Sequence, residues 1–132
     1  MRRFERIDVP RARDAVLPKR ATAYSAGYDF VAPNDIIVHA GGSIVATLKT
    51  GIKARMEPDE FLMICIRSSL GIKWGLALAN GTGIIDADYY GNPNNDGEIC
   101  RSCKSGSLSR CENSQRGSNR TGDLHEVSAR RR

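Results

Sequence analysis

The sequence has few aromatic residues, no long apolar run and no apolar segment behind its first residues. Phe, Tyr and Trp make up 6% of the 132 residues, while Gly is common at 13. That mixture favours short strands joined by tight turns over a helical bundle. No run approaches the roughly 18 apolar residues that a membrane-spanning helix needs. Because the basic start at Met1–Arg6 is not followed by the apolar segment of a secretory signal, we expect a soluble, cytoplasmic protein without a membrane partner.

An excess of positive charge is missing from most of the chain. Residues 1–99 hold 12 basic and 12 acidic residues. Residues 100–132 hold 8 basic and 3 acidic residues, so the net charge of +5 lies in the last quarter. A nucleic-acid interface would bring basic and aromatic residues together on the folded part of the chain. We therefore expect no nucleic-acid partner.

Short apolar runs separated by turn residues predict an all-β fold. The predicted strands are residues 35–38, 43–48, 51–56, 61–66, 76–79 and 83–85. Phe61–Ile66 is unbroken and apolar, which predicts a strand buried on both faces. Asn80-Gly81 is a dipeptide that hairpin turns favour. Strands at this spacing indicate a sandwich or a barrel, and no amphipathic helix is evident.

The character of the chain changes after Ile99. Residues 100–132 hold seven Ser and only three branched aliphatic residues. Such a segment buries too little apolar surface to offset the entropy of ordering itself. We therefore predict a β domain at residues 1–99 and a disordered, Ser/Arg-rich tail at residues 100–132.

Polar groups with possible chemistry interrupt the predicted strands. Asp29 lies at the start of one strand, where a turn residue is the simpler interpretation. Arg67-Ser68-Ser69 follows the most apolar strand. A guanidinium, two hydroxyls and the neighbouring backbone N–H groups can bind an oxyanion together. A strand end capped by serines is the structural alternative.

The third polar group spans residues 80–91. Asn80 offers both a donor and an acceptor, which reading the edge of a pyrimidine requires. Asp86 and Asp88 point the same way if they lie on a strand. A carboxylate near phosphate can orient and deprotonate an attacking water. A calcium-binding loop is the alternative, but the regular alternation of ligands and the closing Glu are missing.

Taken in this order, the three groups resemble the trimeric dUTPase family over about residues 20–99. The stretch Gly83-Ile84-Ile85-Asp86-Ala87-Asp88-Tyr89 is the most specific part of the resemblance. The resemblance implies a jelly-roll-like β-barrel or sandwich, here incomplete at the carboxy end. It also implies a homotrimer with active sites at the subunit interfaces, which hydrolyses dUTP to dUMP and pyrophosphate with Mg²⁺ bound to the triphosphate.

The resemblance also implies a role for each matching residue. Asp86 is expected to activate the water that attacks the α-phosphorus. Tyr89 is expected to pack on the deoxyribose and to leave no room for a 2′-hydroxyl. Asp29 is expected to help hold the Mg²⁺ ion through water. The residues expected to read uracil are Asn80, Ile84 and Ile85, and those expected to bind phosphate are Arg67, Ser68 and Ser69.

Two stretches of the family pattern are missing: a Gly-x-Arg-x-x-Gln stretch and a Gly-rich carboxy-terminal arm with an Arg. Both should lie beyond Ile99. Back-translating Glu112–Arg131 and reading the codons one base out of frame permits the missing Gly-x-Arg-x-x-Gln stretch. We therefore hypothesise that the carboxy-terminal part is frameshifted or truncated. We expect this chain to fold poorly or to be nearly inactive.

Two other functions stay open. A dCTP deaminase shares the fold but is expected to carry a Trp after an Asp-Pro-type third motif, where this chain has Asp86-Ala87-Asp88-Tyr89. An inactive or regulatory relative would bind dUTP without turning it over. Cys100 and Cys103 with Cys111 and His125 could be read as a zinc site, but the loose spacing and the lack of hydrophobic support disfavour it.

Overall fold

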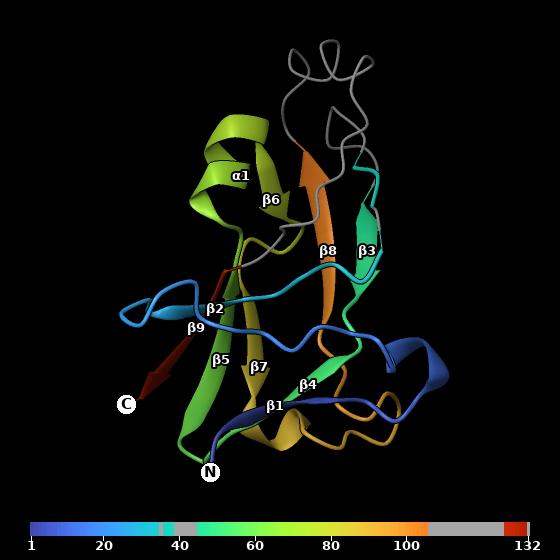
Figure 1. Ribbon diagram of the computed structural model, residues 1–132. Coiled ribbons are helices and arrows are strands. Elements are labelled where there is room, and N and C mark those ends of the chain that lie inside the picture. The colour runs from blue at the N-terminus through green and yellow to red at the C-terminus, as the bar shows by residue number, and fades with distance from the viewer. Residues whose placement is uncertain (35, 39–44, 106–125, 132) are drawn as a thin grey trace.

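The computed structural model describes residues 1–34, 36–38, 45–105 and 126–131, and of the last segment only the backbone. Strands dominate it, which confirms the all-β prediction (Figure 1). The strands are β1 (Arg3–Arg6), β2 (Gly27–Asp29), β3 (Ala46–Lys49), β4 (Ile52–Arg55), β5 (Glu60–Cys65), β6 (Leu76–Leu78), β7 (Gly83–Asp86), β8 (Cys100–Ser105) and β9 (Glu126–Arg131). The helices are α1 (Ser68–Trp74) and the 3₁₀ turns η1 (Pro10–Ala12) and η2 (Ala87–Tyr89).

The strands form three antiparallel sheets. Their orders are β1-β4, β2-β9-β5-β7 and β3-β8-β6. In the second sheet β5 and β7 run side by side, with Phe61 opposite Asp86 and Leu62 opposite Ile85 (Figure 1). The turn before β7 is the expected one at Asn80-Gly81, where the Gly81 N–H donates to the carbonyl oxygen of Leu78 at 3.0 Å. This pairing holds the third polar group at the edge of a sheet.

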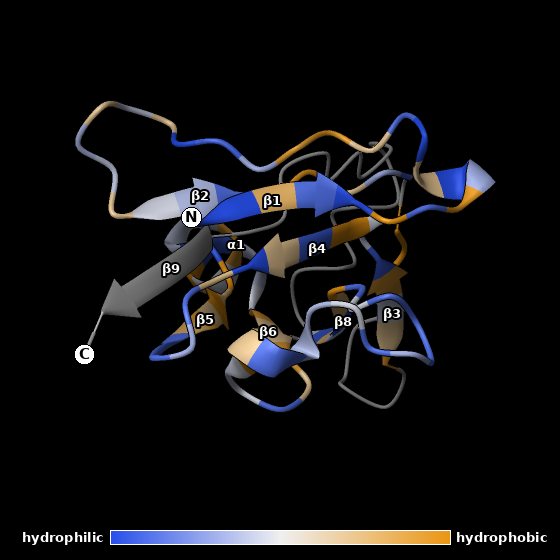
Figure 2. Ribbon diagram, turned by 90° about the horizontal axis from the view of Figure 1, so that it is seen from below, coloured by the Kyte–Doolittle hydropathy of each residue, from blue (hydrophilic) through white to orange (hydrophobic). Residues whose placement is uncertain are grey.

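A core of small and branched side chains lies between the sheets. Its largest fully buried members include Phe30, Ile52, Leu62, Ile64 and Ile99. In Figure 2 the strand β1 shows one hydrophobic band between hydrophilic ends. Phe4 is the apolar residue of β1, and its ring meets the rings of Tyr28 and Phe30 edge-on, with ring centroids 5.4 Å apart in both pairs. Edge-to-face packing of this kind adds to the burial of apolar surface.

Burial of β5 alternates along the strand. Leu62 and Ile64 are buried, whereas Phe61, Met63 and Cys65 are half-buried. The prediction that residues 61–66 are buried on both faces is therefore wrong for the single chain. One face meets the core, and the other borders the surface that carries β7's polar residues.

Helix α1 was not expected from the sequence. Leu70 is its one buried residue and packs with Leu76, Ile66 and Trp74. Gly75 ends the helix in the left-handed conformation at φ 64, and its N–H donates to the carbonyl oxygen of Gly71. Glycine adopts that conformation without steric cost, so the sequence ends the helix there. The predicted strand at residues 35–38 is not formed at residues 36–38, and Asp35 lies outside the described residues.

Strands continue past the domain boundary predicted at Ile99. Cys100–Ser105 forms β8, which pairs with β3 on one side and β6 on the other. Backbone hydrogen bonds to two neighbours order this segment even though its side chains are mostly polar. Residues 126–131 form β9 between β2 and β5. The predicted disordered tail therefore differs from the structure at these two strands, and residues 106–125 lie outside the described part.

Alternation along β8 separates the two cysteines of the considered zinc site. Cys103 is buried in the core, and Cys100 is exposed on the other face. Cys111 and His125, the other two residues of that pattern, lie outside the described residues. Within the described residues, no group of three or more His, Cys, Asp or Glu side chains could hold a metal ion.

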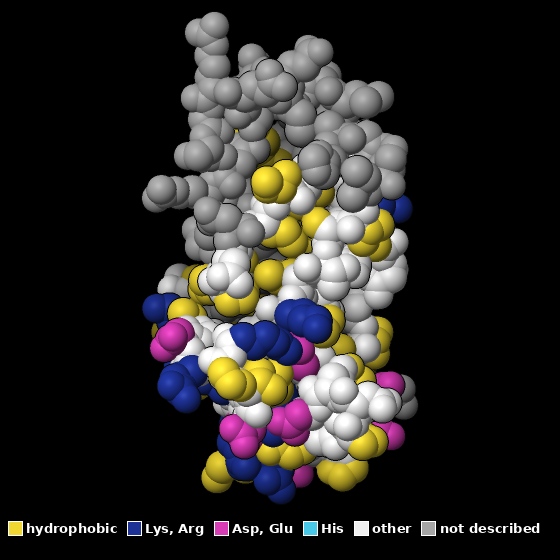
Figure 3. All heavy atoms as spheres, turned by 90° about the vertical axis from the view of Figure 1, so that its right-hand side faces the viewer, with side chains coloured by type: hydrophobic (Ala, Val, Ile, Leu, Met, Phe, Trp, Pro, Cys, Tyr) yellow, Lys and Arg dark blue, Asp and Glu magenta, His cyan; other side chains and the backbone are white. Residues whose placement is uncertain are grey.

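Charges of both signs are mixed on the surface. Figure 3 shows Lys and Arg side chains next to Asp and Glu side chains over the described part of one face. Lys53 and Asp96, for example, form an ion pair at 2.8 Å. No helix of the described chain has both the length and the apolar character needed to cross a membrane.

Candidate active site

Strand β7 presents two residues outward and one inward. Ile84 and Asp86 are exposed, while Ile85 packs against the core. Gly83 lets β7 approach β5, because a Cβ at this position would lie 3.2 Å from the Cβ of Ile64. Asp86 ends the strand in an extended conformation and begins η2. Its carboxylate is therefore held at a fixed point of the backbone and stays open to solvent.

A pocket of about 290 Å³ brings together the three residues expected to read a base. Asn80 comes from the hairpin turn, and Ile84 and Ile85 come from β7. Ile64 and Leu78 add apolar surface. The opposite wall is residues 100–102 of β8. A concave site that combines apolar surface with a few polar groups suits a flat, partly polar ring.

A larger hollow of about 820 Å³ adjoins the other side of β7. Ile84 borders both this hollow and the smaller pocket. The acidic residues that line the hollow are Asp59, Glu60, Asp86 and Asp88. An anion would be repelled by this lining unless cations came from the ligand or from another chain. The hollow can thus position a water beside Asp86, but it does not offer a phosphate site by itself.

The residues expected to bind phosphate lie around the start of α1. Ser68 and Ser69 are exposed on its first turn, and Arg67 directly precedes them. Arg67 Nη1 lies 3.4 Å from Oδ2 of Asp29, so the structure joins these two predicted site residues. Neither the pocket nor the hollow beside β7 is lined by Arg67, Ser68 or Ser69. One chain therefore carries the base-reading and phosphate-binding residues in separate places.

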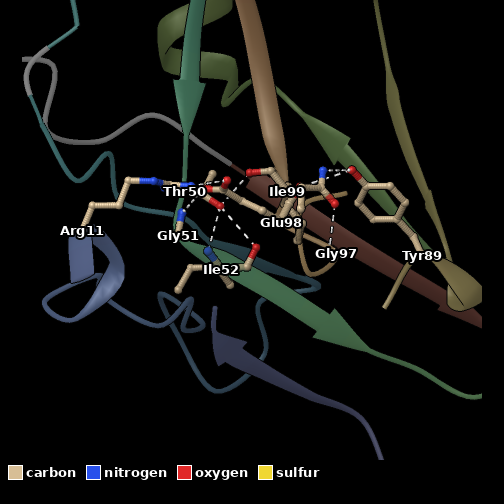
Figure 4. A network of polar contacts seen from close by, with 9 residues as sticks. Arg11, Thr50, Gly51, Ile52, Tyr89, Gly97, Glu98 and Ile99 are labelled. Atoms are coloured by element: carbon tan, nitrogen blue, oxygen red, sulfur yellow. Dashed lines mark hydrogen bonds and ion pairs between the residues drawn. The ribbon is translucent and has the colours of Figure 1, made fainter. Parts of the chain in front are cut away.

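Tyr89 is held by a network that the sequence did not suggest (Figure 4). Its hydroxyl accepts a hydrogen bond from Asn95 Nδ2 at 2.6 Å and donates to the carbonyl oxygen of Glu98 at 3.4 Å. The Glu98 carboxylate in turn accepts two hydrogen bonds from Arg11, at 2.7 and 2.6 Å, and one from the Gly51 N–H at 2.9 Å. Paired donors of this kind are strong because the acceptor is charged.

The Glu98 carboxylate is held by three hydrogen bonds, two from Arg11 and one from the Gly51 N–H. Burial raises its pKa, but the hydrogen bonds from Arg11 and from the Gly51 N–H outweigh burial, so the pKa lies below its ordinary value. Its side chain is 3% exposed and stays charged at neutral pH. Arg11 and Glu98 are 87 residues apart, and no spacing rule connects residues at that separation.

The described residues offer little to a metal ion on their own. Asp29 is the one residue expected to help hold Mg²⁺, through water, and its carboxylate faces Arg67. Mg²⁺ in proteins is commonly held by one or two carboxylates together with substrate phosphates. The arrangement around Asp29 fits an ion that arrives with a triphosphate, and it does not fit a preformed metal cage.

The model of the dUTPase family matches residues 13–94 of this chain. A deoxyuridine 5′-triphosphate nucleotidohydrolase of Lactococcus lactis is 39% identical over 99 residues, which cover 75% of this chain and 65% of that protein. One from Rickettsia rickettsii is 41% identical over 76 residues, covering 57% and 51% of the two chains. The chain thus spans between half and two thirds of the length of these curated relatives.

Solved structures of dUTPases are similar to this chain in fold. The dUTPase from Streptococcus mutans superposes with a TM-score of 0.72 at 30% identity, covering 98% of this chain and 94% of that one. A mutant dUTPase from phage phi11 of S. aureus, whose structure concerns the coordination of a structural Mg(II) ion, gives a TM-score of 0.72 at 18% identity. That match covers 100% of this chain and 91% of the phage protein.

Proposed function

The chain belongs to the dUTPase family, and from that premise we propose that it binds dUTP and hydrolyses it to dUMP and pyrophosphate. One observation carries the proposal above all. Asn80 from the hairpin turn and Ile84 and Ile85 from β7 line a single pocket, and Asp86 ends the same strand. Ile84 borders both this pocket and the hollow that Asp86 lines, so a nucleotide with its base in the pocket can extend past Ile84 toward the solvent-exposed carboxylate.

The chemical step needs a base near the α-phosphorus. Asp86 accepts a proton from a water molecule, the water oxygen bonds to the α-phosphorus, and the bond from that phosphorus to the bridging oxygen of the β-phosphate breaks. Pyrophosphate leaves and dUMP stays on the base-reading pocket. The amide of Asn80 can donate to one edge atom of uracil and accept from another. The family resemblance implies that the backbone around Ile84 and Ile85, together with Asn80, favours uracil over cytosine. Tyr89 packs on the deoxyribose.

The phosphates are expected to contact Arg67, Ser68 and Ser69. A guanidinium and hydroxyl donors offset the charge that develops as pyrophosphate leaves. Mg²⁺ bound to the triphosphate would offset more of that charge, with Asp29 touching the ion through water.

The separation of the two groups within one chain supports a shared site. The hollow beside Asp86 is acidic, and the phosphate-binding residues lie around the start of α1. If copies of the chain assemble, the phosphate donors of one copy can face Asp86 of the next. We therefore propose a homotrimer with shared active sites, acting in the cytoplasm.

Pyrophosphate release from dUTP tests the proposal, with dCTP as the competing substrate. We expect slow release from dUTP, no ammonia from dCTP, and a loss of at least about a hundredfold in Asp86→Asn. Asp86→Asn should still bind a non-hydrolysable imido analogue of dUTP. Analogue binding without any turnover would favour the regulatory alternative, and ammonia from dCTP would favour the deaminase.

A further inference from the structure

We propose that Asn95 positions the ring of Tyr89 and thereby sets the preference for deoxyribose over ribose. This inference rests on the proposed function, because it assumes that Tyr89 packs on the sugar. Asn95 belongs to the loop between η2 and β8 and was not singled out by the sequence. It is a positioning residue, since it acts on the substrate only through Tyr89.

Both the nitrogen and the oxygen of the Asn95 side-chain amide form hydrogen bonds. Its Nδ2 donates to the hydroxyl of Tyr89 at 2.6 Å, and its Oδ1 accepts from the Gly97 N–H at 3.1 Å. The backbone of Asn95 also holds the loop, with its N–H donating to the carbonyl oxygen of Asn92 and its own carbonyl oxygen accepting from the Glu98 N–H at 3.0 Å. The side chain therefore connects the phenol to a loop that is itself hydrogen-bonded.

The loop cannot shift easily away from Tyr89. At Gly97 the backbone has φ +75, and a Cβ there would lie 2.6 Å from the carbonyl oxygen of Tyr89. Only glycine allows so close an approach with that conformation. On the far side of the loop, the charged Glu98 is tied to Arg11 and to the Gly51 N–H. Figure 4 shows the Tyr89 hydroxyl directed toward this anchored segment.

When its hydroxyl is fixed, the Tyr89 ring distinguishes deoxyribose from ribose by shape. Ribose differs from deoxyribose by one oxygen, which a ring free to tilt can accommodate. The two hydrogen bonds of the Tyr89 hydroxyl oppose such a tilt, because tilting breaks at least one of them. Loss of one hydrogen bond corresponds to a change of about two- to tenfold in an equilibrium constant.

The test measures equilibrium binding of the imido analogues of dUTP and UTP to the full chain, with Mg²⁺ present. For the unmodified chain we expect tighter binding of the deoxy analogue. In Asn95→Ala the ratio of the two affinities should fall about fivefold. The matched control is Asn92→Ala in the same loop, because its Oδ1 accepts from the Asn94 N–H. The backbone N–H of Asn92 donates to the carbonyl oxygen of Tyr89, and that contact is kept in the variant. That control should keep the ratio.

Tyr89→Phe gives a second test that leaves the loop intact. It removes the hydroxyl, so it should lower the affinity ratio as much as Asn95→Ala does. In the Tyr89→Phe background, Asn95→Ala should change the ratio no further. An unchanged ratio in both single variants, with normal discrimination by the parent chain, would overturn the role of Asn95 alone. Failure of the parent chain to bind either analogue would overturn the proposed function as well.

Discussion

Two buried charges that lie three residues apart, Glu98 and Arg101, have opposite surroundings. The Glu98 carboxylate is paired with Arg11 and with a backbone N–H. The Arg101 residue is 2% exposed, and its Nε, Nη1 and Nη2 have no hydrogen-bond partner among the described residues. Its guanidinium lies 4.6 Å from the ring centre of Phe30, and burial lowers the pKa of Arg101 to about 9.

The difference between the surroundings of Glu98 and Arg101 falls at Ile99, after which the sequence no longer suits the fold. Natural chains rarely bury an arginine without hydrogen bonds, because the loss of hydration is large. Among the described residues before Ile99, every buried side-chain nitrogen or oxygen has a hydrogen-bond partner, whereas β8 turns Arg101 into the core without one. Arg101 of β8 occupies a core position that an apolar side chain would fill. This supports the hypothesis that the residues after Ile99 are read from another frame. The same strand forms one wall of the base-reading pocket.

The largest expected effect comes from replacing the region after Ile99. We expect a chain with the restored reading frame to hydrolyse dUTP at least about a hundredfold faster than this chain, because it regains donors to the phosphates. The comparison requires sequencing the encoding DNA and assaying both chains. Full activity from the 132-residue chain, or codons that give no such frame, would contradict the hypothesis.

Within the present chain, Arg101→Met should stabilise the fold. The unbranched methionine fills similar space without a buried charge, so we expect the free energy of unfolding to rise by about 3 kcal/mol. Urea denaturation measures it, with Lys104→Met as the matched control on the exposed face of β8. Equal effects of the two substitutions would mean that Arg101 is not the misfit described above.

Breaking the ion pair between Arg11 and Glu98 should lower the free energy of unfolding, by less than Arg101→Met raises it. Arg11→Ala leaves the Glu98 carboxylate buried with only the Gly51 N–H, which should lower the free energy of unfolding by about 2 kcal/mol. Arg13→Ala, which changes an exposed neighbour of the same 3₁₀ turn, is the control. If Arg13→Ala destabilises as much, the ion pair with Glu98 is not the cause.

Not all of this could be predicted from the sequence. The Asn80-Gly81 turn and β7 were predictable because their signals are local. Helix α1 was not, because seven residues span fewer than two helical turns, which is too short for a periodic apolar pattern to stand out, and the helix depends on packing Leu70 against Leu76. The Arg11–Glu98 pair and the place of β8 depend on chain segments far apart in sequence, which the topology brings together.

The smallest effect concerns pH. Because the pKa of Glu98 in the folded chain lies below its unfolded value near 4.5, its charged form stabilises the fold above that pH. This contribution should be lost as the pH falls below 4.5 and through the folded pKa. In Glu98→Gln, the free energy of unfolding should fall less between neutral and acidic pH than it does in the parent chain, by about 1 kcal/mol or less. A decline as steep as that of the parent chain would show that other carboxyls cause the acid sensitivity.

A crystal structure of the chain with the imido analogue of dUTP tests the central claim most directly. Our account predicts the uracil ring between Asn80 and the backbone of Ile84 and Ile85, with the Asp86 carboxylate facing a water near the α-phosphorus. A nucleotide bound elsewhere, or an Asp86 carboxylate far from every phosphate, would contradict it.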